Sequence, residues 1–98
     1  MKKIPTEIKE NLQFLCVEID AQLATLSSYY RNPSASLARK VRDRAGYAYN
    51  LKTRIHTATV NRIAAGVEHD SDKFCLRCIE FIATDIERIA EICRHCIT

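Results

Sequence analysis

The sequence is poor in residues that break helices, since its 98 residues include only two glycines and two prolines. This scarcity argues against an all-β fold, whose strands are joined by many tight turns. Tryptophan is absent, and no apolar run exceeds the four residues 14–17. We therefore expect no transmembrane helix, which would need about 20 apolar residues. The charged N-terminus lacks the apolar stretch of a signal peptide, so we expect a cytoplasmic protein.

What is present fits one domain over residues 1–98, because a chain of this length buries well over half of its surface on folding. The net charge of +3 is spread unevenly. Residues 1–31 carry four basic and four acidic side chains, residues 32–66 seven and one, and residues 67–98 four and seven. We expect these thirds to attract one another and expect no binding of nucleic acid.

Three long stretches, without a breaker apart from Gly46, predict helices at about residues 5–31, 33–65 and 70–97. Pro5 and the pair Asn32-Pro33 suit helix starts, because proline fits the first helical turn and asparagine is a good cap. Gly66 suits the end of the second helix, and Asp70-Ser71 can cap the third.

Apolar residues recur every three or four positions in each stretch, which predicts helices packed at a shallow angle. The expected core residues are Ile8, Leu12, Leu15, Ile19, Leu23, Leu26 and Tyr30, then Leu37, Val41, Ala45, Ala48, Leu51, Ile55 and Ala58, then Cys75, Ile79, Ile82, Ile86, Ile89, Cys93 and Cys96. Short connections make neighbouring helices antiparallel. The predicted fold is an all-α, antiparallel three-helix bundle with a groove that a fourth helix could fill.

Five cysteines are many for this length. Cys75 and Cys78, with Cys93 and Cys96, have the Cys-x-x-Cys spacing of structural zinc sites. An unbroken helix would hold the two pairs about 27 Å apart, too far for one ion. We favour core packing for these thiols and for Cys16. The alternative is a two-thiolate copper or zinc site on one helical turn, completed by His95, Cys16 or another subunit.

Glu87 and Glu91 lie one helical turn apart, with Asp85 nearby, and such a set can hold a divalent cation. Acidic pairs of this kind are also common on solvated helix faces. His56 and His95 have no nucleophile with suitable spacing, and the sequence contains no Gly-rich phosphate loop. We therefore expect no enzymatic activity.

Four basic residues cluster early in the second stretch, namely Arg39, Lys40, Arg42 and Arg44. This basic face could bind phosphate groups, anionic lipid or an acidic partner protein. The alternative is a solvated face that pairs with the acidic third helix.

The segment Asp85-Ile86-Glu87-Arg88-Ile89-Ala90-Glu91 resembles the signature helix of PhoU-like domains. Residues 50–66, which end in Arg62-Ile63-Ala64-Ala65-Gly66, also look like that family, in particular the soluble C-terminal module of bacterial sodium/phosphate cotransporters. The resemblance covers about residues 35–98.

The resemblance implies a three-helix repeat that controls phosphate uptake without catalysis. It also implies that Glu87 and Glu91 bind iron or another divalent metal, although Ala45 and Tyr49 stand where a companion acidic motif is expected. The predicted partner is a phosphate transporter or signalling component, with contact to a membrane only through a transporter. A homodimer or higher oligomer is compatible with this function. The alternatives are a metal-binding bundle and a generic self-associating scaffold.

Overall fold

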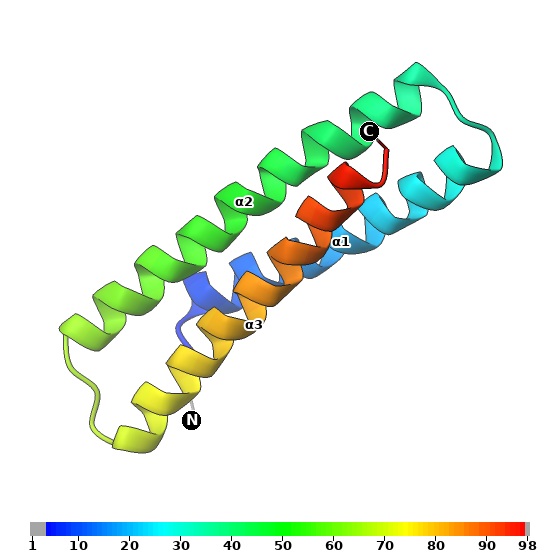
Figure 1. The fold of residues 1–98 in the computed structure, drawn as a ribbon. Coiled ribbons are helices and arrows are strands. Elements are labelled where there is room, and N and C mark those ends of the chain that lie inside the picture. The colour runs from blue at the N-terminus through cyan, green and yellow to red at the C-terminus, as the bar shows by residue number, and fades with distance from the viewer. Residues whose placement is uncertain (1–3, 98) are drawn as a thin grey trace.

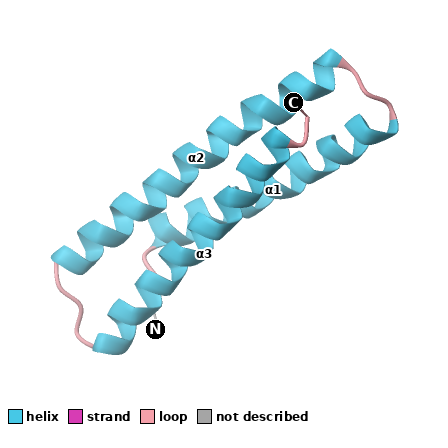
Figure 2. Ribbon diagram, viewed as in Figure 1, coloured by secondary structure: helices cyan, strands magenta, loops and turns pink. Residues whose placement is uncertain are grey.

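The computed structural model describes residues 4–97, which form three helices joined by two short connections (Figure 1). Helix α1 spans Thr6–Arg31, α2 spans Ala35–Ala64 and α3 spans Asp70–His95. Neighbouring helices run antiparallel, and everything between them is loop (Figure 2). Each helix contacts both others, so the fold is the predicted all-α, antiparallel three-helix bundle. The expected domain also included residues 1–3 and 98, which lie outside the described residues.

The helices end within two residues of the predicted positions, but two of the expected caps are wrong. The second helix begins after Ser34, whose hydroxyl accepts a hydrogen bond from the Leu37 backbone N–H at 3.1 Å. Asn32 instead ends α1. His69 occupies the N-cap of α3, and Asp70 is its first residue, where a negative charge favours the positive end of the helix dipole. Gly66 ends the second helix as predicted, with a φ of 99° that favours glycine.

The core runs along the axis of a bundle that measures 52 × 18 × 17 Å. The second helix contributes the buried residues that its spacing predicts, which are Val41, Ala45, Ala48, Leu51 and Ile55. In α1, Ile8, Leu15 and Ile19 are buried, whereas Leu23 and Tyr30 are exposed and were wrongly expected in the core.

The third helix is rotated relative to its predicted orientation. Its buried residues are Leu76, Ile79, Ala83, Ala90 and Cys93, followed by Ile97 just beyond the helix. Ile82 and Ile89, which were expected in the core, are 50% and 40% exposed. Small side chains at positions 83 and 90 let α3 approach the other helices closely, because closely packed helices leave little room for large residues at the contact.

A buried amide joins all three helices. The side chain of Gln22 in α1 is fully buried, and its Nε2 donates to the carbonyl oxygens of Val41 in α2 at 3.1 Å and of Ala90 in α3 at 3.2 Å. Its Oε1 is also buried, and among residues 4–97 it has no hydrogen-bond partner. A buried polar atom that is unpaired costs free energy, so this residue fixes the relative positions of the helices at some cost in stability.

Ion pairs at the surface add to these contacts. Arg44 of α2 pairs with Glu18 of α1 at 3.0 Å, and Lys52 of α2 pairs with Glu87 of α3 at 3.8 Å. His56 of α2 lies 3.1 Å from Glu80 of α3. The basic second helix therefore does meet the acidic third helix, although each exposed pair stabilises the fold by only about 0–1 kcal/mol.

Substitutions of Gln22 will separate packing from hydrogen bonding. We expect Gln22→Ala to lower the free energy of unfolding by about 2–4 kcal/mol, because it leaves a cavity between three helices. Gln22→Leu should cost less than about 1 kcal/mol, since it refills the space and removes the unpaired Oε1. The carbonyls of Val41 and Ala90 keep their partners within their own helices.

Urea unfolding followed by circular dichroism measures both variants, with the exposed Gln13→Ala as a control that should stay within about 0.5 kcal/mol of wild type. A cost for Gln22→Leu equal to that of Gln22→Ala would show that the amide hydrogen bonds, and not the filled volume, hold the helices together.

Candidate functional site

The outward side of α3 carries large apolar side chains in contact with solvent. We call Phe74, Phe81, Ile82, Ile89 and Ile92 the outer face of α3; their exposed fractions are 71%, 61%, 50%, 40% and 55%. Scattered single apolar residues are normal on a protein surface, whereas a contiguous group on one helix commonly marks an interaction site. The outer face is therefore the first candidate site.

A regular seam runs along this face. We define the outer seam as Phe74, Cys78, Phe81, Asp85, Arg88, Ile92 and His95, whose positions alternate by four and three residues. This alternation is the spacing at which one helix packs lengthwise against another. Asp85 and Arg88 lie at the middle of the seam, and both are exposed. Over residues 4–97 neither side chain takes part in an ion pair, so both are available to a partner.

The cysteines do not behave as one group. All five thiols are free, but only Cys93 is buried, while Cys75 and Cys78 are partly buried. Cys16 and Cys96 are exposed, so the expectation that they pack in the core is wrong. The two pairs lie near opposite ends of the continuous third helix, which agrees with the wide separation that its helical period predicts. Burial raises the pKa of the Cys93 thiol, and the neighbouring Cys96 raises it further.

The exposed Cys96 meets α1 at the end of the bundle. The Tyr30 hydroxyl donates a hydrogen bond to the Cys96 carbonyl oxygen at 3.1 Å. The Cys96 side chain, also within hydrogen-bond reach, raises the pKa of Tyr30. The contact ties the C-terminal end of α1 to the last turn after α3.

The acidic residues proposed as metal ligands have basic neighbours. Glu87 pairs with Lys52, and Glu91 pairs with Arg94 and lies 3.4 Å from His95. Arg94 lowers the pKa of Glu91. Asp85 lies on the outer seam, away from both. Within the described residues no group of three or more His, Cys, Asp or Glu side chains could hold a metal ion, so a metal at Glu87 and Glu91 would have to displace their basic partners.

The predicted basic face divides between two sides of α2. Residues four apart share a helix side, so Lys40 and Arg44 lie together, and they line a hollow of about 300 Å³ with Glu18, Asp43 and Tyr47. Arg44 is already paired with Glu18 there. Arg39 and Arg42 are exposed on another side. Neutralisation by the two acidic residues makes this hollow an unpromising site for an anion.

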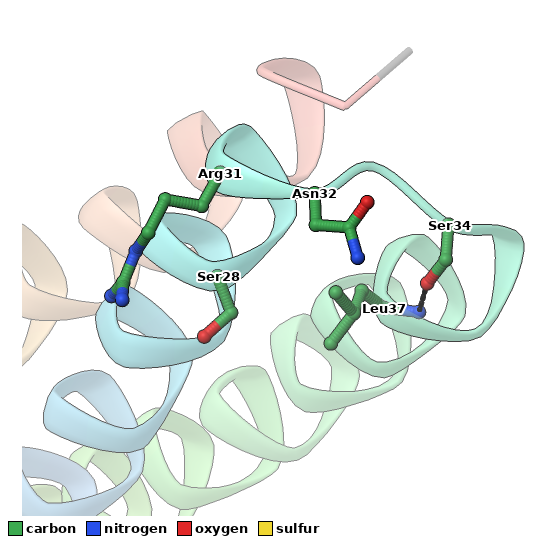
Figure 3. Close-up of a pocket in the computed structure, with 5 residues that line it drawn as sticks. All are labelled: Ser28, Arg31, Asn32, Ser34 and Leu37. Carbon is green, nitrogen blue, oxygen red and sulfur yellow. Dashed lines mark hydrogen bonds between the residues drawn. The ribbon is translucent and has the colours of Figure 1, made fainter.

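A second hollow of about 370 Å³ lies at the connection between α1 and α2 (Figure 3). Ser28, Arg31, Asn32, Ser34 and Leu37 line it. Figure 3 shows Arg31 extending along α1, away from Ser34, whose hydroxyl caps the N-terminal end of α2. The polar groups here serve the turn, and they do not converge on one point.

Sequence reasoning missed the outer face. It assigned Ile82 and Ile89 to the core and gave Phe74, Phe81 and Ile92 no role. The signal was the number of large apolar residues in the third helix, which is greater than one buried stripe can hold. As for a membrane location, none of the helices in residues 4–97 is long and apolar enough to cross a bilayer.

Thiol reactivity tests the orientation of α3. Because only accessible thiolates react quickly, we expect a brief treatment of native protein with iodoacetamide to modify Cys16 and Cys96 first and Cys93 last. Peptide mass spectrometry gives the extent at each position. In guanidinium chloride all five cysteines should react at similar rates, which is the control. Modification of Cys93 as early as Cys96 in the native protein would mean that α3 presents a different side to solvent.

Comparison of the chain with protein-family models, with curated proteins and with solved structures found no match. The resemblance of residues 85–91 to the PhoU-like signature thus stays a prediction. A proposal of function therefore rests on the surfaces that the fold exposes. Of these, the outer face of α3 supplies a large apolar area, and the outer seam adds two charged groups in a regular helical spacing.

Proposed function

We propose that the chain is a non-enzymatic binding module that takes an amphipathic helix of a partner protein on the outer face of α3. The observation that carries this proposal is the exposure of Phe74 and Phe81, at 71% and 61%, beside three exposed isoleucines on the same helix. A soluble monomer gains nothing from large aromatic side chains in water, whereas aromatic residues supply much of the energy of protein interfaces.

The exposed area is large enough to support binding. A phenylalanine side chain buries about 200 Å² when fully covered, so the two together offer roughly 250 Å² at their observed exposures. Covering that area contributes roughly 6 kcal/mol at about 25 cal/mol per Å². The isoleucines add to this sum, and the loss of freedom on association offsets part of it.

The spacing of the outer seam specifies the shape of the partner. A seam that alternates by three and four residues fits another helix laid along it. With 26 residues, α3 offers about 39 Å of contact length. A complementary helix would carry apolar residues opposite Phe81 and Ile92, a basic residue opposite Asp85 and an acidic residue opposite Arg88.

The PhoU-like resemblance would make this partner a phosphate transporter or a signalling component of phosphate uptake. That identity rests on residues 85–91 and 50–66 alone and stays a prediction. The binding mode is independent of it, because it depends on α3 and not on the phosphate pathway.

Photo-crosslinking tests the binding surface. Phe81 is replaced by the photoreactive residue benzoylphenylalanine, and the variant is irradiated in cells that produce it. We expect adducts larger than the 11.2 kDa chain, because the side chain at this position is held against a partner. Mass spectrometry should place the attached residue on the apolar side of a helix.

Phe14 provides the matched control, since it is also a phenylalanine, is 56% exposed and lies on α1. The same replacement there should give far fewer adducts. Equal yields at the two positions, or none at position 81, would contradict the proposal.

A further inference from the structure

We propose that the occupant of the outer face is a second copy of this chain, packed with its α3 antiparallel to the first about a two-fold axis between Ile86 and Glu87. This inference rests on the proposed function and names the partner of the same surface. It predicts a symmetric dimer in which the two outer seams pack against each other.

The symmetry pairs residues that lie equally far from the axis on opposite sides. Asp85 then faces Arg88 of the second copy, and Arg88 faces its Asp85. One step outward, Phe81 faces Ile92 of the second copy. The seam consists of two series of positions, one at 74, 81, 88 and 95 and the other at 78, 85 and 92. Each residue of one series faces a residue of the other series, as in antiparallel helix pairs. The centre of the interface therefore holds two ion pairs between two pairs of large apolar residues.

Other arrangements of the two seams would bring like charges together or place a charged group against an uncharged one. A parallel dimer would place each Asp85 against Asp85 and each Arg88 against Arg88 of the second copy, and like charges repel. Moving the antiparallel axis to Ala83 would place Phe81 against Asp85 of the second copy and Cys78 against its Arg88. Only the axis between Ile86 and Glu87 matches apolar with apolar and acid with base, so charge complementarity selects one register.

The rest of the bundle leaves this surface open. The buried side of α3 carries Leu76, Ile79 and Ala83, and the outer seam lies on the opposite side of the same helix. In Figure 1, α3 crosses in front of α1. Two such helices can meet without displacing α1 or α2.

The size of the contact can be compared with that of a stable dimer. A stable dimer commonly buries about 800 Å² per partner, which is about an eighth of the 6439 Å² accessible surface of this chain. In the proposed register residues 78–95 of the two α3 helices overlap, which gives a helix pair about 27 Å long. The large side chains of the outer seam increase the area that this pair buries. Phe74, at 71% exposed, lies one helical turn before this overlap and can extend the contact at each end.

Sedimentation equilibrium in reducing buffer tests the dimer. We expect the wild-type chain to reach twice its mass of 11.2 kDa, with a Kd of roughly 10 µM or tighter. The double variant Phe81→Glu/Ile92→Glu should be monomeric, with unchanged helicity by circular dichroism because both positions are exposed. Val17→Glu is the matched control, since Val17 is 64% exposed on α1, and it should leave the dimer intact.

Charge reversal tests the register. Asp85→Arg alone, and Arg88→Asp alone, should each weaken the dimer at least about tenfold, because each turns two attractive pairs into two repulsive ones. The double variant Asp85→Arg/Arg88→Asp should restore the Kd to within about threefold of wild type, since it exchanges the two charges. In a parallel dimer each of these residues faces its own copy, so a reversal would replace one pair of like charges by another. An unchanged Kd for the single variants would therefore overturn this register.

The outcomes separate this inference from the proposed function. A wild-type chain that stays monomeric at millimolar concentration, while benzoylphenylalanine at position 81 attaches to a helix of another protein, would overturn the dimer and leave the binding module in place. A monomer that also gives no more adducts at position 81 than at position 14 would overturn both.

Discussion

The buried side chain of Gln22 is the point at which all three helices meet. Its Nε2 reaches carbonyl oxygens of α2 and α3 at 3.1 and 3.2 Å, so the backbone of α3 must pass close to α1 at Ala90. Close passage requires small side chains on the inward side, and Ala83 and Ala90 supply them. With the alanines turned inward, the isoleucines at positions 89 and 92 point outward. The apolar outer face of α3 is therefore a consequence of how the core is built.

Much of the fold could be predicted from the sequence because the relevant signals are local. Scarce glycine and proline, and a three–four apolar alternation, are sufficient to place three helices to within two residues. The core of α2 was also predictable, since most of its aliphatic residues fall on one stripe. The rotation of α3 was not, because its apolar residues occupy more than one side and periodicity cannot tell which side is buried. A polar residue in the core, Gln22, gives no periodic signal at all.

The candidate sites were harder to predict, because contacts between distant residues decide them. Glu87 and Glu91 have the spacing of metal ligands, but Lys52 and Arg94 lie beside them in the folded chain. The four basic residues between positions 39 and 44 fall on two sides of one helix. Cys16 has apolar neighbours in the sequence and yet is exposed. In each case the residue type was informative about chemistry, while its surroundings, which determine whether that chemistry is available, come only from the fold.

Helix α3 exposes more large apolar side chains than a monomer needs. Stability of an isolated bundle would be served by large residues inside and small or polar ones outside, because each large apolar residue contributes most when it is buried. Here Leu76 and Ile79 face the core together with two alanines, but two phenylalanines and three isoleucines of the same helix face solvent. The second copy proposed above would cover the outer face and bury these exposed residues in the core of an assembly. In the proposed dimer each bundle would be one half of a packed unit, with the two α3 helices in the central layer.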